Sequence, residues 1–317
     1  MILNEKLKPR PINPVSSDLI CGAVAILGKP NVGKSTFLNS VLKQKIAIVS
    51  PRPQTTRSSM AGIYQDDRSQ IVFYDTPGVH QPKNKLSQYM IHQVEEALEG
   101  ADAALFLVDA KEGITEEEYL VAEWLKKFKK PVLCLLNKID QVTEGRAQEL
   151  TGKIKGEMGK DWLLFRISAL SGKGVQEVVQ QLQKFLPHQP PLFPEEELTD
   201  KTMRDIAAEM VREQCFLQLL QELPYGVAVL IDQFDEKTPP DPVVIKATIY
   251  VEKDSQKGIV IGVGGKQLKA IGMAARQEIE KLLGQKVFLE LWVKVLKNWR
   301  KDEDVLKRLG YAVTKKK

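Results

Sequence analysis

Residues 28–35 constrain the fold of this chain more than any other stretch. They read Gly-Lys-Pro-Asn-Val-Gly-Lys-Ser, which is the G-x-x-x-x-G-K-S pattern of a phosphate-binding loop. The apolar run 22–27 precedes the pattern and the amphipathic segment 34–42 follows it, as expected for a loop between a strand and a helix. Glycines let backbone amides surround phosphate oxygens, and the helix N-terminus adds partial positive charge. A glycine-rich turn that binds nothing is the alternative.

We expect this loop to hold a nucleotide. Lys34 would reach the β- and γ-phosphates, and the Ser35 hydroxyl would bind Mg²⁺. The expected nucleotide-binding residues of the loop are Gly28, Lys29, Pro30, Asn31, Val32, Gly33, Lys34, Ser35 and Thr36.

The surrounding sequence predicts a doubly wound α/β domain. Short apolar runs at 22–27, 70–74, 103–108, 132–136 and 163–167 alternate with helix-like segments at 34–42, 86–98, 116–127 and 175–186. This alternation is typical of a mostly parallel sheet covered by helices on both faces.

A second domain is expected after a linker. Residues 186–198 contain four prolines and three consecutive glutamates, and proline stops helices. A long helix over 199–222, strands at 226–234, 243–251 and 287–295, and a Gly-rich turn within a helical stretch then predict a small α+β domain. The expected divisions are an irregular leader at 1–20, a nucleotide-binding domain at 21–186, a linker at 187–198 and the second domain with its basic tail at 199–317.

Two motifs at predicted strand ends indicate that the bound base is guanine. In Asn137-Lys138-Ile139-Asp140, the Asp140 carboxylate would accept hydrogen bonds from guanine N1 and N2, a pair of donors that adenine lacks. Asn137 would bind the other purine edge, and the Lys138 stem would lie across the ring. Ser168-Ala169 would add a backbone donor, although a serine there is also typical of a helix cap.

A third motif, Asp75-Thr76-Pro77-Gly78, ends another predicted strand. Asp75 would hold Mg²⁺ through water, and the Gly78 amide would sense the γ-phosphate. The polar, Pro-rich loop between residues 45 and 60 would supply a threonine that binds Mg²⁺ in the triphosphate state, and we favour Thr56 over Thr55. A mobile surface loop is the alternative. The expected metal-binding residues are Ser35, Thr56 and Asp75; the expected nucleotide-binding residues outside the phosphate loop are Asp75, Thr76, Pro77, Gly78, Asn137, Lys138, Asp140, Ser168 and Ala169.

The net charge of +5 is an average over unlike parts of the chain. Residues 253–317 hold 16 Lys and Arg against 7 Asp and Glu, a net of +9, whereas the preceding 252 residues carry a net of −4. This asymmetry favours a basic module that meets a polyanion, and a solvated basic tail ending in Lys315, Lys316 and Lys317 is the alternative.

Two classes of protein are excluded or disfavoured by the composition. No apolar stretch approaches ~18 residues, which argues against a transmembrane span, and the N-terminus lacks the apolar core of a signal peptide. Cys21, Cys134 and Cys215 occur singly in apolar stretches, which suits a reducing compartment. We therefore expect a cytoplasmic protein.

Residues 259–268 resemble the V-I-G-x-x-G-x-x-I core of KH domains. A bare turn at Gly262 and Gly265 would press against the backbone of single-stranded RNA, and nearby lysines would favour phosphates. Val263 and Gly264 stand where a basic residue is common, while Ile261 and Leu268 are expected in the core. Trp292 would pack against a helix, with base stacking as the alternative. The expected RNA-binding residues are Gly262, Val263, Gly264, Gly265, Lys266, Lys269 and Arg276.

These motifs together resemble the Era family of bacterial GTPases, over residues 21–311. The stretches 223–225 (Leu-Pro-Tyr), 289–295 (Leu-Glu-Leu-Trp-Val-Lys-Val) and 309–311 (Leu-Gly-Tyr) also carry the resemblance. It implies a GTPase domain followed by a KH-type domain, with GTP hydrolysis coupled to small-subunit ribosome maturation. The implied partners are GTP, GDP, the small subunit and the 3′ region of its ribosomal RNA. We expect a monomer; a peripheral membrane association through the lysine-rich end is the alternative.

One position suggests an unusual hydrolytic mechanism. The residue after Gly78 is Val79 and not the glutamine that positions water in Ras-like proteins, so we expect slow intrinsic turnover. Asn31 resembles an asparagine that supports a monovalent cation in related GTPases, which implies K⁺ as a cofactor besides Mg²⁺. The expected catalytic residues are Lys34, Thr56, Asp75, Gly78 and Asn31.

Overall fold

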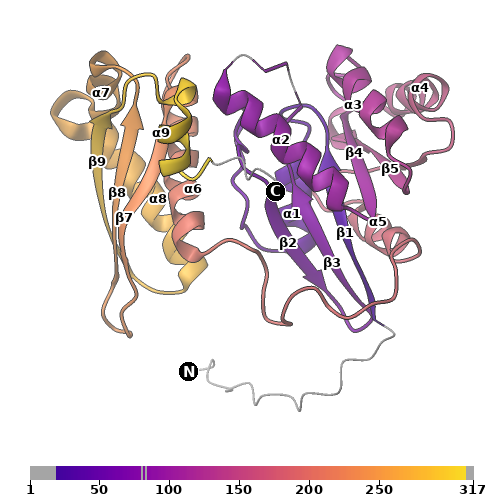
Figure 1. Ribbon diagram of the computed structural model, residues 1–317, viewed down its shortest axis with the longest axis horizontal. Helices are drawn as coiled ribbons and strands as arrows, with labels where there is room; N and C mark the ends of the chain where they lie inside the picture. Colours follow the sequence, from indigo (N-terminus) through magenta and orange to yellow (C-terminus); the bar gives the residue numbers. More distant parts are fainter. Residues whose placement is uncertain (1–18, 80, 83, 312–317) are drawn as a thin grey trace.

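The computed structural model describes residues 19–79, 81–82 and 84–311. Figure 1 shows two lobes side by side, one from the N-terminal part of the chain and the other from the C-terminal part. The predicted leader, apart from its last two residues, and the terminal lysines lie outside the described residues. Within the described ranges no helix is long and apolar enough to cross a membrane.

The first lobe is built on a six-stranded sheet in the order β2-β3-β1-β4-β5-β6. Its strands are β1 (Ile20–Leu27), β2 (Met60–Gln65), β3 (Ser69–Asp75), β4 (Ala103–Asp109), β5 (Val132–Asn137) and β6 (Leu163–Arg166). All neighbouring pairs are parallel except β2 with β3. The central strands are buried on both faces, which explains their continuous apolar runs.

Helices cover both faces of this sheet (Figure 1). One face packs against α1 (Lys34–Leu42) and α5 (Val175–Leu182), and the other against α2 (Lys85–Gly100), α3 (Glu116–Lys127) and α4 (Glu144–Lys153). A π-helical turn, η2 (Ile154–Met158), extends α4. The predicted doubly wound fold is confirmed.

The second lobe is a three-stranded sheet whose first three helices pack on one face, while its last helix packs through Leu306 against Ala228 and Tyr250 on the other. Its strands are β7 (Ala228–Asp235), β8 (Val243–Val251) and β9 (Val287–Val295), with β7 antiparallel and β9 parallel to β8. The helices are α6 (Met203–Gln218), α7 (Asp254–Ile261), α8 (Lys266–Leu283) and α9 (Glu303–Arg308), with the short turns η3 (Pro224–Gly226), η4 (Val263–Gly265) and η5 (Trp299–Lys301). The element order agrees with the predicted α+β domain.

The first helix of this lobe is shorter than the sequence pattern predicts. Thr202 and Asp205 form a reciprocal capping box that starts α6 at Met203 rather than at residue 199. The helix ends at Gln218, before residues that run into η3. Both limits therefore differ from the predicted helix over 199–222.

The segment at 187–198 has no helix or strand of its own, yet it is bonded to the first sheet. The amide of Gln70 on β3 donates to the Phe193 carbonyl and accepts from the Leu192 and Phe193 N–H groups. The Ile63 N–H on β2 donates to the Leu198 carbonyl at 2.9 Å. The linker thus runs along the first lobe and does not hang free.

The two lobes share one apolar core cluster. It extends from the sheet and α1 through the loop residues Ile46 and Ala47 to Ile206 and Met210 of α6 and on to the second sheet. A smaller cluster joins Tyr89 and Met90 of α2 to Trp299 and Leu306 near the C-terminal end. The lobes are consequently packed together at two places.

Candidate functional site

The phosphate-binding loop between β1 and α1 has the backbone geometry that the pattern predicts. Gly28 and Gly33 have φ values of 154° and 100°, and a Cβ on Gly33 would lie 2.4 Å from the Asn137 amide nitrogen. Lys34 is buried, and its Nζ donates to the carbonyls of Gly28 at 3.1 Å and Lys29 at 2.9 Å. Burial lowers the pKa of Lys34 to about 8. An anion in the loop would compensate this buried charge.

Three oxygen-bearing side chains meet beside the loop. The Ser35 hydroxyl donates to Asp75 Oδ2 at 2.6 Å and lies 3.0 Å from the Thr56 hydroxyl. Burial raises the pKa of Asp75 to about 6, and its Oδ1 has no hydrogen-bond partner within the described residues. A hard divalent cation with oxygen ligands fits this donor set and would relieve the buried carboxylate. These residues would hold Mg²⁺.

The neighbouring threonine is turned away from the cation site. The Thr55 hydroxyl lies 2.6 Å from the Ser50 hydroxyl and donates to the Arg52 carbonyl at 2.8 Å. Thr55 is therefore hydrogen-bonded within the loop, and Thr56 is the threonine that faces Ser35.

The base-recognition motif follows β5. The Asn137 amide donates to the Val32 carbonyl at 2.7 Å and accepts from the Ala169 N–H at 2.9 Å, so it ties three loops together. Lys138 Nζ donates to Asp109 Oδ2 and to the Asn31 carbonyl. Asp140 is exposed on the short helix η1 (Ile139–Gln141). A guanine carbonyl would have to share the Ala169 N–H with Asn137.

Some of these residues line a cavity of about 450 Å³, which is large enough for a nucleotide; Asp75, Asn137, Asp140 and Ala169 do not line it. Lys34, Ser35, Thr56 and Gly78 line its end at the phosphate-binding loop, and Lys138 lines its other end. Sequence patterns missed several further lining residues, among them Glu112, Gln141 and Leu170, the last of which is 79% exposed. The sequence signal that could have identified Leu170 is its position directly after the Ser-Ala pair.

The end of β3 contacts the phosphate-binding loop. A Cβ on Gly78 would lie 2.5 Å from the Pro30 nitrogen, so only glycine allows this approach. The Val79 N–H donates to the Gly28 carbonyl at 3.2 Å, and its side chain is fully buried in the core. Thr76 is also buried, where its hydroxyl donates to the Ile26 carbonyl at 2.6 Å. Val79 is therefore a core residue and does not line the cavity.

A buried ion pair that sequence patterns missed supports the loop from α3. Lys29 Nζ lies 3.1 Å from Glu118 Oε1 and 2.9 Å from Glu112 Oε2. The Glu118 side chain is fully buried, and its other oxygen accepts from the Thr115 N–H and hydroxyl at the start of the helix. Glu118 thus connects the helix start to the phosphate-binding loop.

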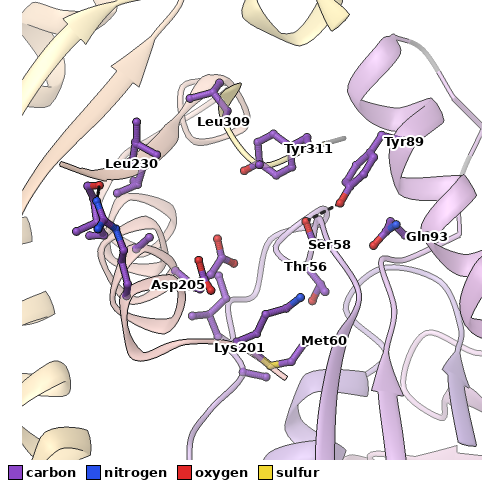
Figure 2. A pocket seen from close by; sticks show the side chains of 18 of the residues that line it. Thr56, Ser58, Met60, Tyr89, Gln93, Lys201, Asp205, Leu230, Leu309 and Tyr311 are labelled. Carbon is purple, nitrogen blue, oxygen red and sulfur yellow. Dashed lines mark hydrogen bonds between the residues drawn. The ribbon is translucent and has the colours of Figure 1, made fainter. Parts of the chain in front are cut away.

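A second cavity, of about 420 Å³, lies between the lobes on another side of Thr56 (Figure 2). Thr56, Ser58 and Tyr89 line it from the first lobe, and Leu230 and Tyr311 from the second. The Tyr89 hydroxyl donates to the Ser58 hydroxyl at 3.1 Å. Thr56 borders both cavities, so no closely packed side chains hold it on the two sides that face them.

The predicted RNA-binding turn joins α7 to α8. Gly262, Gly264 and Gly265 have φ values of 71°, 60° and 77°, and a Cβ on Gly262 would lie 2.7 Å from Gln267 Cβ. Val263 is 88% exposed at the tip. The turn therefore presents backbone to solvent, as a loop that grips a nucleic-acid backbone must.

A groove of about 380 Å³ continues from this turn between α8 and β9. Lys269 and Arg276 line it together with Leu268 and the half-exposed Met273. Of these four residues, sequence patterns missed Met273. Lys266 is exposed beside the turn but does not line the groove. Leu268 packs against the core, as expected, and also forms part of the groove wall.

The expectation that Trp292 packs against a helix is wrong. Trp292 is 57% exposed. The alternating residues Leu291 and Val293 face the core cluster beneath α8, so Trp292 points to the opposite face of the sheet.

Comparisons with known proteins agree with this geometry. Residues 23–138 match the family described as 50S ribosome-binding GTPase, and residues 222–300 match the KH domain family. GTPase Era of Alkaliphilus metalliredigens is 46% identical over 290 residues, covering 92% of this chain and 98% of the relative. GTPase Era of Geobacter metallireducens is 47% identical over 295 residues, covering 92% and 97%.

Two solved structures resemble this chain over both of its lobes. One is Era in complex with MgGDPNP and nucleotides 1506–1542 of 16S ribosomal RNA, and the other is a variant of Aquifex aeolicus Era bound to GDP·AlF4⁻. Each has a TM-score of 0.89 and 40% sequence identity and covers 93% of this chain and 100% of the solved one. The expected family is confirmed: the chain belongs to the Era family of GTPases.

Proposed function

We propose that this protein binds and hydrolyses GTP with Mg²⁺ and acts in small-subunit ribosome maturation by binding near the 3′ end of the small-subunit ribosomal RNA. The observation that carries the proposal is the convergence of Ser35, Thr56 and Asp75, from three separate segments, beside the phosphate-binding loop. The RNA target is supported by the solved Era complex with nucleotides 1506–1542 of 16S ribosomal RNA. We further propose that the protein works as a monomer in the cytoplasm.

Each part of the site has a distinct task in this reaction. Lys34 holds the β- and γ-phosphates, and the backbone amides of the loop surround their oxygens. Mg²⁺, when bound, neutralises the charge that develops on the transferred phosphoryl group. Thr56 would contact the cation in the triphosphate state, and the Gly78 amide would face the γ-phosphate. Asp140 selects guanine.

A substitution at Asp140 tests the guanine assignment. An asparagine amide donates to one purine substituent and accepts from N1–H, which matches xanthine better than guanine. Asp140→Asn should lower GTP affinity by about a hundredfold and raise affinity for xanthosine triphosphate. Fluorescent-nucleotide titrations would measure both affinities. Unchanged GTP affinity would remove Asp140 from the site, and Lys34→Ala should lower the affinity for either nucleotide.

We propose that turnover is slow because the apolar, buried Val79 stands where Ras-like proteins have the glutamine that positions water, and that K⁺ assists hydrolysis. The Asn31 amide donates to the Pro51 carbonyl at 2.8 Å, which draws the loop at 50–54 over the nucleotide cavity. The remaining Asn31 side-chain oxygen and nearby loop carbonyls are the oxygen ligands that a monovalent cation requires. Such a cation would stabilise the charge of the phosphoryl group as an arginine finger does.

Hydrolysis rates in K⁺ and Na⁺ buffers of equal ionic strength test this role. K⁺ should raise the rate, and Asn31→Ala should abolish the difference between the two cations. Equal rates for the unaltered protein, or a K⁺ response that survives Asn31→Ala, would contradict the proposal.

The alternative of a membrane-associated protein makes a separate prediction. Crosslinking followed by sequencing of the bound RNA should recover the 3′ region of the small-subunit ribosomal RNA. Binding to vesicles of anionic lipid with no recovered RNA would overturn the proposed function.

A further inference from the structure

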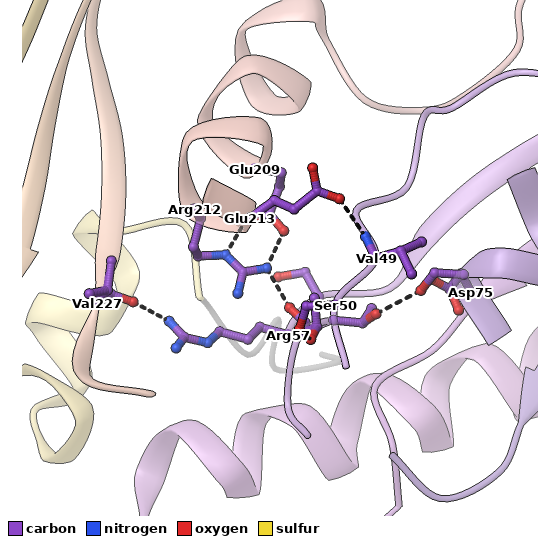
Figure 3. Close-up of polar contacts among 12 residues, drawn as sticks. Val49, Ser50, Arg57, Asp75, Glu209, Arg212, Glu213 and Val227 are labelled. Carbon is purple, nitrogen blue, oxygen red and sulfur yellow. Dashed lines mark hydrogen bonds and ion pairs between the residues drawn. The ribbon is translucent and has the colours of Figure 1, made fainter. Parts of the chain in front are cut away.

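The second lobe holds the loop that carries Thr56. This loop joins α1 to β2, and α6 contacts it at several points (Figure 3). The Val49 N–H donates to Glu213 Oε1 at 2.8 Å, and Lys45 Nζ donates to Glu213 Oε2 at 2.7 Å. The Glu213 side chain is only 1% exposed, so both of its carboxylate oxygens depend on these contacts rather than on water.

Two buried arginines connect the residues on either side of Thr56, which are Thr55 and Arg57, to the second lobe. Arg212 of α6 donates to the Thr55 carbonyl and forms an ion pair with Glu209. Arg57 donates in the other direction, from the loop to the second lobe. The residue before Thr56 and the residue after it are therefore both hydrogen-bonded to the second lobe.

Arg57 is built into the second lobe. Its guanidinium donates to the Val227 carbonyl at 2.6 Å and to the Tyr225 carbonyl at 3.0 Å. It also lies 5.7 Å from the Phe216 ring centroid and 5.6 Å from that of Trp299. A guanidinium offers a planar fork of donors and an aromatic-stacking face at once, which lysine does not. Arg57 therefore fixes the backbone of the loop to η3 and to Val227, the residue before β7.

These contacts constrain the hydroxyl that faces the cation site. Thr56 borders two cavities, so it has space to move, and its hydroxyl lies 3.0 Å from that of Ser35. Moving Thr56 away would break the Thr55 carbonyl contact or shift Arg57 out of its aromatic and carbonyl surroundings. The loop position thus depends on polar contacts to the second lobe.

We propose that Arg57, Arg212 and Glu213 are positioning residues that hold Thr56 in the triphosphate-binding arrangement, so that the RNA-binding lobe contributes to the preference for GTP over GDP. The inference rests on the proposed function of the nucleotide site. GDP offers no γ-phosphate, so its affinity does not depend on the position of Thr56. A ligand shifts the equilibrium between two positions of Thr56 only if it binds one of them more tightly than the other, and only GTP does so here.

Full-length Arg57→Ala tests this role with a fluorescent non-hydrolysable GTP analogue and fluorescent GDP. In Mg²⁺, the affinity for the GTP analogue should fall by about tenfold while that for GDP changes by less than about twofold. In EDTA the selective loss should disappear, because Thr56 acts through the cation. Lys85→Ala is the matched control, since it removes an exposed pair to Glu303 between the lobes without touching the loop.

The outcomes separate this inference from the proposed function. Equal losses for both nucleotides, a loss that persists in EDTA, or an unchanged affinity for the GTP analogue would overturn the positioning role. If Arg57→Ala does not fold, Arg57→Lys retains the charge and removes the fork, and should give a smaller loss in the same direction. An unaltered protein that binds neither nucleotide would instead refute the proposed function.

Discussion

At the nucleotide site, Lys34 and Asp75 are both buried with their charges incompletely compensated. Burial lowers the pKa of Lys34 to about 8 and raises that of Asp75 to about 6. Both shifts have the same cause, which is the loss of hydration of the charged form. Phosphate would compensate the lysine and Mg²⁺ the carboxylate. The ligand-free site therefore carries an unfavourable free energy that binding relieves.

Asp75→Asn should stabilise the ligand-free protein. The unfolded chain loses the Asp75 proton near pH 3.8, but the folded protein keeps it until about pH 6. The carboxyl therefore lowers stability as pH rises between these values, by at most about 3 kcal/mol at ~1.4 kcal/mol per pKa unit. In EDTA without nucleotide, the variant should melt at a higher temperature than the unaltered protein at pH 7.5. The difference should shrink as pH falls toward 4.

The exposed Asp67 provides the control, because Asp67→Asn should leave the melting temperature unchanged. A variant at Asp75 that is less stable than the unaltered protein at pH 7.5 would contradict the prediction. Adding Mg²⁺ and GTP should reverse the order, since binding then stabilises the unaltered protein more.

At the scale of single elements, α3 supports the phosphate-binding loop through Glu118. This carboxylate caps the helix with one oxygen and faces Lys29 with the other. Glu118→Gln can keep the capping bond but removes the negative charge beside the buried lysine. Removing one partner of a buried ion pair is destabilising because the remaining charge is left without compensation.

We expect Glu118→Gln to lower the free energy of unfolding by about 3 kcal/mol, measured by urea denaturation. GTP and GDP affinities should fall together, because the loop holds phosphates common to both. The exposed neighbour Glu116→Gln should change neither quantity. A selective loss of GTP binding would show that the Glu118 pair acts on Thr56 and not on the phosphate-binding loop.

Elements with local sequence signals could be predicted, and those set by distant contacts could not. The predicted helix at 116–127 has the bounds of α3 because Thr115 and Glu118 form a capping box within a few residues. Strand β2 was not predicted, since its pairing with β3 depends on a turn at Asp66 whose carboxylate accepts from Arg68 and Ser69 N–H groups. Helix α4 was not predicted either; its apolar face is sparse.

The same distinction applies to the candidate site. Ser35, Asp75 and Asn137 could be located because each follows a strand in a fixed motif. Lys29 with Glu118, and Arg57 with Val227, join residues far apart in sequence, so only the folded chain shows these pairs. The groove residue Met273 was missed because half-exposed apolar residues on a helix have no distinctive pattern.

At the scale of the whole molecule, charge is distributed unevenly between the lobes. The net +9 lies in residues 253–317, which include the exposed turn and the groove with Lys269 and Arg276. The nucleotide phosphates, in contrast, would lie in an enclosed loop beside the buried Lys34. Salt screens exposed charges more than buried ones.

RNA binding should therefore depend on salt much more than nucleotide binding does. We expect the affinity for an RNA of the 3′ region to fall by at least about tenfold between 50 and 200 mM salt. Lys269→Ala should weaken binding and reduce the slope of log affinity against log salt by about 1. Filter binding at several salt concentrations measures both. A flat salt response would remove the phosphate contacts from the account of RNA binding.

The bonded linker limits how far the lobes can separate. The Leu198 carbonyl and the Asp200 carboxylate are bonded to β2, and α6 begins at Met203. A tether this short keeps the second lobe at an effective concentration of roughly millimolar or above beside the first. If the contacts between the lobes break, the tether lets them re-form while the protein stays on one RNA. Reclosure is a unimolecular step, independent of how dilute the protein is in the cell.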